Sequence, residues 1–159
     1  MENFTQVIIH AARVGNIEVL QELIDRGVDI NLQDEKGYTP LIIACYNNQY
    51  AAAEFLIGHG SDVNAVDYGG NTALMGVSFK GYPQIAELLI RKGADLDRQH
   101  GNGGTALMFA AMFGRHELLR LLLQAGAKTD LVDHRGMSVY DLAAQQGNTE
   151  AISILQAAS

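Results

Sequence analysis

The sequence contains a single cysteine, which excludes an internal disulfide framework and a cysteine-based zinc site. Basic residues are also scarce, since 11 Lys and Arg against 18 Asp and Glu give a net charge of −7. Such an acidic chain lacks the positive surface that binds a phosphate backbone, so nucleic acid is disfavoured as a partner. No apolar run reaches the ~18–20 residues of a membrane span, and the N-terminus lacks the basic start and apolar core of a secretory signal. We therefore expect a cytoplasmic protein with no membrane partner.

Proline is rare as well, with two residues, whereas glycine is abundant, with 17 in a chain of 159. The length is that of one ordinary domain, and 48% of the residues are hydrophobic, which is enough for a packed core. The 18% of charged residues is too low for a disordered chain. The glycines therefore need a structural reason, and their spacing gives one.

Glycines and several other residues recur along the chain with a period of 33 residues. We call a set of positions separated by multiples of this period a repeat column. The columns are Gly27, Gly60, Gly93 and Gly126; Gly37, Gly70, Gly103 and Gly136; Thr39, Thr72, Thr105 and Ser138; Leu23, Leu56, Leu89, Leu122 and Leu155; and Gly15, Asn48, Gly81, Gly114 and Gly147. They divide the chain into units 1–33, 34–66, 67–99, 100–132 and 133–159. Such a period is typical of stacked repeats, none of which buries its apolar face alone.

Each unit has the pattern of two helices followed by a loop. The column of Thr39 suits helix N-caps, and Pro40 suits the first helical position behind the cap. A glycine, or Asn48, then marks the turn between the two helices. Segments such as 17–26 and 116–125 carry apolar residues at helical spacing and end near a glycine. A hairpin turn marked by an aspartate and a glycine follows.

The Thr-Pro-Leu motif with a later alanine, and its Thr-Ala-Leu variant, resembles the core of the ankyrin repeat family, which has the same period. The matching residues are Thr39-Pro40-Leu41 with Ala44, Thr72-Ala73-Leu74, and Thr105-Ala106-Leu107 with Ala110-Ala111. The Thr-Ala-Leu-Met motif is similar to that of ankyrin repeats common in bacteria. The resemblance covers essentially the whole chain and implies an all-α repeat solenoid, an ankyrin-like stack of helix-turn-helix units with hairpin loops, in one domain over 1–159.

The end units are expected to be polar caps, 1–33 at the N-terminus and 133–159 at the C-terminus, so that the protein is small and complete. Unit 1–33 has a polar start and lacks the hairpin motif. The residues of the last unit that replace apolar or small ones are Asp141, Gln145, Gln146, Asn148 and Ser159.

The sequence departs from the family pattern in several places. The residues that stand where the family has a histidine after Thr-Pro-Leu are Ile9, Ile42, Met75, Met108 and Asp141. The hydrogen bonds of that imidazole must therefore be replaced or lost. His100 stands where a hairpin aspartate is expected, among several glycines, so we expect this hairpin to be the most mobile. Gly58 and Gly76 fall within predicted helices, where the repeat gives no reason for them.

Candidate catalytic and metal-binding groups are few. His100, Asp133 and His134 can approach each other at adjacent hairpin tips, which leaves a metal or small-molecule site there as an alternative function. Solvated turn residues are the simpler interpretation. No serine has the context of a catalytic nucleophile, and the glycines at 101–104 lack the lysine of a phosphate loop. Cys45 shares a column with small residues and is predicted to be an inert core thiol, and we expect no catalytic residue, metal or cofactor.

The segment from Leu56 to Asn64 resembles a Leu…Asp-Val-Asn pattern that asparaginyl hydroxylases modify in ankyrin repeats. Asn31 matches the pattern more loosely. The simpler interpretation, which we favour, is that both asparagines brace the loop before the hairpin, and modification of Asn64 stays an open alternative.

The surface that the scaffold does not need is expected to bind a protein. In this fold the first helices and the hairpin tips line a concave face, and large residues stand in its exposed columns. The predicted partner-binding residues are Arg13, Tyr38, Tyr46, Asn47, Tyr68, Phe79, Lys80, Met112 and Phe113. The expected apolar anchors are Tyr46, Phe79, Met112 and Phe113, because aromatic residues and methionine are enriched at interface centres. The alternative is that these side chains fold back against the hairpins and fill local gaps.

The sequence therefore predicts a non-enzymatic, monomeric protein–protein interaction module that acts as an inhibitor, adaptor or accessory factor. The distribution of charge indicates the kind of partner. Units 1–33 and 34–66 carry nine acidic and three basic residues, a net charge of −6, whereas the other units carry nine acidic and eight basic residues, a net charge of −1. We expect the partner to present a basic zone to the N-terminal half.

Overall fold

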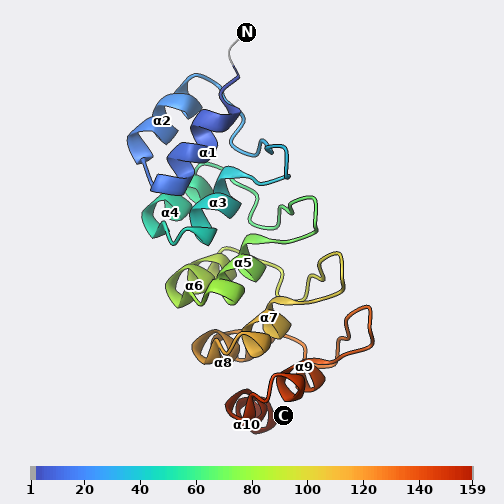
Figure 1. Cartoon of the computed structure of the whole chain (residues 1–159). Coiled ribbons are helices and arrows are strands. Elements are labelled where there is room, and N and C mark those ends of the chain that lie inside the picture. Colours follow the sequence, from blue (N-terminus) through green and yellow to red (C-terminus); the bar gives the residue numbers. More distant parts are fainter. Residues whose placement is uncertain (1–2, 159) are drawn as a thin grey trace.

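The computed structural model describes residues 3–158, which form ten helices arranged as five stacked pairs (Figure 1). The helices are α1 (Thr5–Val14), α2 (Ile17–Asp25), α3 (Pro40–Tyr46), α4 (Tyr50–Gly58), α5 (Ala73–Lys80), α6 (Pro83–Arg91), α7 (Ala106–Met112), α8 (His116–Gln124), α9 (Val139–Gln145) and α10 (Thr149–Ala158). Each of the five sequence units contains one pair, and a hairpin loop projects between successive pairs. Each hairpin takes the number of the unit that it begins, so the hairpins run from the second, at Asp34, to the fifth, at Asp133. The predicted all-α repeat solenoid is confirmed.

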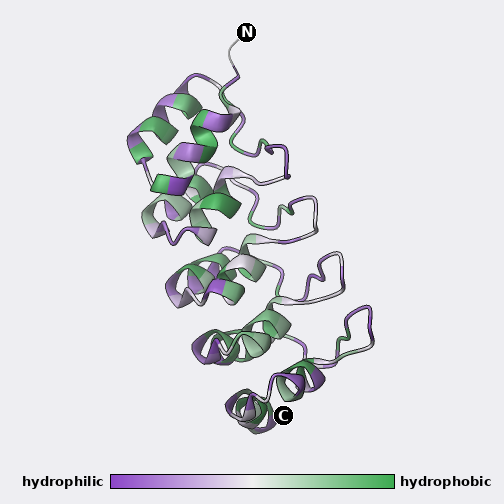
Figure 2. Cartoon of the chain, in the orientation of Figure 1, coloured by the Kyte–Doolittle hydropathy of each residue, from purple (hydrophilic) through white to green (hydrophobic). Residues whose placement is uncertain are grey.

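The core runs through the whole stack. Each first helix packs against its own second helix and against the first helix of the next unit. The buried apolar residues join into one cluster that extends from Ile8 in α1 to Leu155 in α10. Figure 2 shows the hydrophobic residues gathered in the helices, while the hairpin tips are mostly hydrophilic. The units therefore depend on their neighbours for burial, as expected for a solenoid.

The predicted N-caps are present at the first helices of the last four units. The Thr39 hydroxyl oxygen accepts a hydrogen bond from the Ile42 N–H at 3.2 Å, and Thr72, Thr105 and Ser138 cap their helices in the same way. Two residues that stand in the column of the missing family histidine accept a hydrogen bond from the backbone N–H of the capping residue. The Asp141 carboxylate accepts from the Ser138 N–H at 2.9 Å, and the Met75 sulfur accepts from the Thr72 N–H at 3.5 Å.

The glycine columns fulfil their predicted roles at turns. All twelve glycines of the three columns have φ between 65° and 101°, the left-handed region that side chains rarely adopt. Asn48, which fills the gap in one column, has φ of 58° and is the one non-glycine residue within 3–158 with a positive φ. The abundance of glycine is thus explained by helix ends and hairpins.

Neighbouring hairpins are joined by backbone hydrogen bonds. The Tyr68 N–H donates to the Lys36 carbonyl at 3.1 Å, and the Gly101 N–H donates to the Gly69 carbonyl at 2.9 Å. The His134 N–H donates to the Asn102 carbonyl at 2.9 Å. The fourth hairpin, for which the sequence predicts the greatest mobility, is therefore bonded to the hairpins on both sides.

The loops after the second helices are joined through asparagine side chains. The Asn31 amide oxygen accepts from the Asp62 N–H at 2.8 Å, and the Asn64 amide oxygen accepts from the Asp95 N–H at 2.7 Å. Both side chains also donate to the carbonyl of the glycine that follows the next second helix, at 3.3 Å. These bonds agree with the interpretation that the two asparagines brace their loops.

The outer side of the first unit carries exposed apolar residues. Val7 and Val14 in α1 are 46% and 52% exposed, and Val19 of α2 lines the same hollow. Pro40 and Ala52, one period after Val7 and Val19, are buried. The repeat pattern thus continues through the first unit and leaves an apolar stacking surface there.

In the last unit Asp141, Gln145 and Gln146 are exposed, as a polar end requires, and Asn148 is half-buried. Ser159 lies outside the described residues.

Cys45 lies in the packed interior of α3 and has no exposed surface. Burial raises the pKa of its thiol to about 12, so the thiol stays protonated at neutral pH. Since the thiolate is the reactive form, the prediction of an inert core thiol agrees with the structure. None of the helices within residues 3–158 is long and apolar enough to cross a lipid bilayer.

Candidate protein-binding groove

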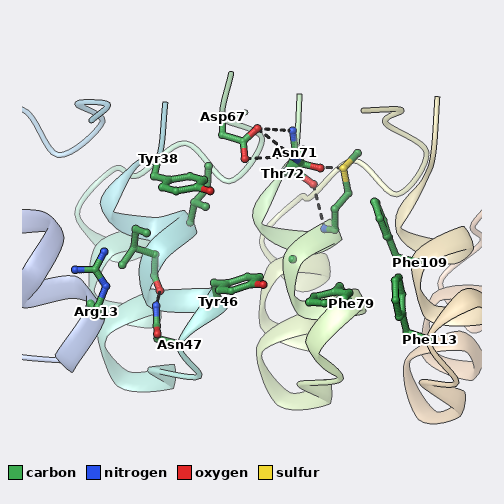
Figure 3. Close-up of a pocket in the computed structure, with 14 residues that line it drawn as sticks. Arg13, Tyr38, Tyr46, Asn47, Asp67, Asn71, Thr72, Phe79, Phe109 and Phe113 are labelled. Atoms are coloured by element: carbon green, nitrogen blue, oxygen red, sulfur yellow. Dashed lines mark hydrogen bonds between the residues drawn. The ribbon is translucent and has the colours of Figure 1, made fainter. Parts of the chain in front are cut away.

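A groove of about 550 Å³ lies between the first helices and the hairpins of the first four units. Its floor comes from α3, α5 and α7, and its far edge comes from the third hairpin (Figure 3). Six of the nine predicted partner-binding residues line it, namely Arg13, Tyr38, Tyr46, Asn47, Phe79 and Phe113. Side chains from four separate units are therefore brought to one surface.

Three aromatic rings form a row along the groove, which we call the aromatic row: Tyr46, Phe79 and Phe113. The rings of Tyr46 and Phe79 are nearly parallel, with 8° between their planes and 6.3 Å between their centroids. Phe113 meets Phe79 edge to face, with 4.7 Å between the centroids. Figure 3 shows the three rings following one another across neighbouring repeats. Each ring comes from the C-terminal part of a first helix or from the residue after it. Tyr46 and Phe79 occupy one repeat column, and Phe113 occupies the next.

The aromatic row stays accessible to solvent. Tyr46 and Phe113 are 40% and 44% exposed, and Phe79 between them is half-buried. Aromatic contacts at these distances stabilise each other by about 0.5–1.5 kcal/mol and fix the ring positions. Filling of gaps against the hairpins therefore does not explain the positions of Tyr46 and Phe113, because part of each side chain stays exposed to solvent.

Cationic groups lie along one side of the groove. The Lys80 ammonium is 5.0 Å from the centroid of the Tyr46 ring, a cation–π arrangement. Arg13 is exposed at the end of the groove in the first unit. Asn47 is exposed too, but its amide nitrogen donates to the Ile43 carbonyl of its own helix at 2.8 Å.

The opposite edge of the groove carries a carboxylate. Asp67 accepts hydrogen bonds from the N–H groups of Gly69 and Asn71, both at 2.9 Å, and holds the third hairpin in shape. The Asn71 side-chain amide reaches both carboxylate oxygens at 3.2 Å. Figure 3 shows this pair at the upper edge, across from the aromatic row. The groove is therefore apolar at its centre and charged at its rims, as protein-binding surfaces commonly are.

The match to known sequences decides the family. A family model described as ankyrin repeats, in three copies, matches residues 8–100 and 74–158. The chain belongs to the ankyrin repeat family. Ankyrin repeats generally serve as protein–protein interaction modules and are typically non-enzymatic.

Similar curated proteins share only part of their length with this ankyrin chain. A segment of 50 residues is 46% identical to palmitoyltransferase akr1 of Emericella nidulans and covers 31% of the chain but 7% of that protein. The akr1 palmitoyltransferase of Aspergillus oryzae is 44% identical over 50 residues, again 7% of its length. An ankyrin repeat protein of Acanthamoeba polyphaga mimivirus is 40% identical over 45 residues, which are 28% of this chain and 35% of the viral protein.

Three predicted partner-binding residues lie outside the lining of the ankyrin groove. Lys80 lies beside it, against Tyr46. Tyr68 is 70% exposed at a hairpin tip, with its ring packed close to Gly37 of the preceding hairpin. Met112 is half-buried and lines a neighbouring hollow of about 500 Å³ together with His134 and other residues of the fourth and fifth hairpins. The four predicted anchors thus separate into the aromatic row and a distinct methionine.

The sequence missed residues that the ankyrin stack places in the groove, among them Phe109, Gly76 and Asp67. Ile43, Gly76 and Phe109 follow one another in one repeat column, which was not predicted to belong to the binding surface. Asp67 was interpreted as a turn residue only. The sequence signal was the mixed character of this column, which holds His10, Gly76 and Phe109, and the structure leaves Phe109 half-buried.

The alternative metal site at the hairpin tips finds no support in the geometry. Within residues 3–158 no group of three or more His, Cys, Asp or Glu side chains is placed to hold a metal ion. The His100 ring packs on Phe109, with 5.1 Å between the centroids. Burial lowers the pKa of His100, although the negative charge of Asp67 acts in the opposite direction. Hydrogen bonds from the N–H groups of Met137 and Arg135 lower the pKa of Asp133, so its carboxylate is engaged in its own turn.

Proposed function

We propose that the chain binds a protein partner through the groove, with the aromatic row as the apolar centre of the interface. The observation that carries the proposal is the row itself, since Tyr46 and Phe113 keep 40% and 44% of their surface exposed in a protein whose other large apolar residues are mostly buried. Contiguous exposed apolar groups mark interaction sites more often than scattered ones do. The molecule acts as a non-enzymatic inhibitor, adaptor or accessory factor for that partner.

The aromatic row has the properties of an interface hot spot. It lies in the middle of the stack, and Lys80, Asn47 and Arg13 provide a polar rim beside it. Aromatic residues at the centre of an interface, surrounded by polar contacts that exclude water, supply most of the binding energy in protein complexes. The three rings are already held in place by their mutual contacts, so little side-chain entropy is lost when a partner binds.

The experiment that tests this function is the substitution Phe79→Ala. Removal of the central ring is expected to weaken partner binding at least ~10-fold, while the chain stays folded because Phe79 is only half-buried. Partner proteins are captured from a lysate of the source cell, identified by mass spectrometry, and titrated against wild type and variant. Tyr50→Ala is the matched control, since Tyr50 is 37% exposed on α4, outside the groove. Equal capture by wild type and Phe79→Ala would show that the groove is not the binding surface.

The partner is expected to be basic where it faces the N-terminal half. That half carries a net charge of −6, and Glu35 lies exposed at the tip of its hairpin. Glu35→Lys is expected to slow association with the captured partner at least ~2-fold and to reduce the dependence of the rate on salt, because attraction between exposed charges acts mainly on association. Stopped-flow association rates at several salt concentrations measure this. Glu54→Lys, which makes the same charge change on exposed α4, is expected to have a smaller effect, and identical rates for all three proteins contradict the basic zone.

A further inference from the structure

Gly76 leaves a gap in the floor of the groove. It belongs to the repeat column of His10, Ile43, Phe109 and Leu142, so every other unit places a large side chain at this position. Ile43 and Phe109, one repeat to either side, both line the groove. Because Gly76 has no side chain, the floor between Ile43 and Phe109 lacks the volume of one large residue.

The local backbone does not require glycine at this position. Gly76 lies within α5, and its φ is not in the left-handed region, unlike that of the column glycines. Glycine is less favourable than alanine inside a helix, so the residue weakens α5. The gap is bounded on one side by Tyr46, whose Cδ1 lies 3.2 Å from the place where a Cβ of Gly76 would be. The absence of a side chain at Gly76 therefore lets the Tyr46 ring lie close to α5 on one side and leaves the floor open on the others.

Asp67 leaves a negative charge at the rim above this gap. Its hydrogen bonds come from its own hairpin and from Asn71, and in the part of the chain that the structure describes it takes part in no ion pair. The equivalent aspartate of the last hairpin, Asp133, pairs with Arg135 at 3.4 Å. The cations Arg13 and Lys80 lie on other parts of the groove, Lys80 against the ring of Tyr46. A basic group of a partner can therefore form an ion pair with Asp67, whose negative charge also acts on His100 of the next hairpin.

We propose that the gap over Gly76 receives a large apolar side chain from an extended segment of the partner protein, and that a neighbouring Lys or Arg of that segment pairs with Asp67. The walls of the gap, Ile43, Phe109 and Tyr46, offer carbon surface to an apolar anchor, and the carboxylate selects the charge beside it. The inference rests on the function proposed above and specifies the chemistry of the partner. It also agrees with the acidic character of the N-terminal half.

A random dodecapeptide phage library selected on the wild-type protein tests the predicted chemistry. The expected result is enrichment of peptides with Leu, Met, Phe or Trp within two positions of Lys or Arg. Enrichment of acidic residues beside the apolar anchor, or of sequences without an apolar residue, overturns the proposal. Light scattering of the protein alone tests whether a second copy of the chain occupies the groove. A dimer that forms with the wild type and is abolished by Gly76→Leu would show this, and it would overturn the proposal.

Five variants then locate the contacts of a synthetic peptide with the selected motif. Gly76→Leu fills the gap and is expected to weaken binding at least ~10-fold, and Gly76→Ala, which retains α5, is expected to weaken it less. Gly58→Leu is the control, since no described atom lies within 4 Å of its Cβ position at the end of α4. Asp67→Asn can keep the hydrogen bonds from the N–H groups of Gly69 and Asn71, loses the one from the Asn71 side chain to the second carboxylate oxygen, and is expected to remove most of the salt dependence of binding. Asp34→Asn, which makes the same change at the equivalent aspartate of the preceding hairpin, is expected to leave binding unchanged.

The results separate this inference from the proposed function. If the peptide binds Gly76→Leu as tightly as wild type but loses affinity for Phe79→Ala, the groove binds proteins and the gap does not hold the anchor. If the peptide binds all of these variants equally, both proposals are wrong. Weakened binding by Gly58→Leu as well as Gly76→Leu would assign the effect to helix disturbance and contradict the role of the gap.

Discussion

Leu122→Ala is expected to lower the free energy of unfolding by about 3 kcal/mol. Leu122 in α8 has no exposed surface and belongs to the leucine column that is buried in every unit. The helix packs against α6, α7 and α10, so a cavity at this position weakens the contacts with both neighbouring units. Loss of a buried leucine side chain removes both its transfer free energy and its packing contacts, because the surrounding helices relax only in part.

The adjacent residue provides a matched control for this prediction. Leu123→Ala makes the same chemical change on the same helix, but Leu123 is only half-buried. Its substitution is expected to cost about 1 kcal/mol or less. Urea unfolding followed by circular dichroism gives both values from the transition midpoint and slope. Equal losses for the two variants would mean that burial in the stack is not the main source of stability at Leu122.

Gly103→Ala is expected to destabilise the protein by about 2–4 kcal/mol, the second largest effect. Gly103 has φ of 86°, where an L side chain is strained. A Cβ added there would also lie 2.8 Å from the backbone nitrogen of His134 and 2.9 Å from the Cα of Asp133. Because these are backbone atoms, the fifth hairpin must move away, which strains the His134–Asn102 hydrogen bond that joins the two hairpins.

Gly136→Ala separates the two causes of the Gly103 effect. Gly136 occupies the same turn position in the last hairpin, with φ of 78°, but no described atom lies within 4 Å of its Cβ position. Only the backbone strain remains, so the expected loss is about 1 kcal/mol. The comparison is made by thermal and urea unfolding of both variants. A Gly136→Ala loss as large as that of Gly103→Ala would contradict a stabilising role for contacts between hairpins.

Six of the nine predicted partner-binding residues line the groove, and the packing of neighbouring units as well as the repeat decides which of them do. Tyr46 and Phe79 share one repeat column, whereas the third ring of the row, Phe113, comes from the next column. Met112, one residue before Phe113, points instead toward the next hairpins, since successive helical residues face different directions. Asn47 is exposed in the groove, and its amide nitrogen donates to the Ile43 carbonyl of its own helix, a bond that the repeat pattern does not predict.

The sequence by itself determined the repeat, its helix caps and its turns. A capping hydroxyl such as Thr39 and a left-handed glycine such as Gly136 act on the backbone within a few residues, so their positions in the chain are sufficient to predict them. The apolar columns likewise determined that the units must stack.

Only the tertiary structure decided which side chains of different units meet. Whether Phe109, Asp67 and Gly76 share one groove depends on how far each unit rotates against the next and on which rotamers the crowded interfaces allow, and neither follows from the 33-residue spacing. The exposed valines of α1 illustrate the same limit, since the stacking surface of the first unit is apolar although its chain start is polar.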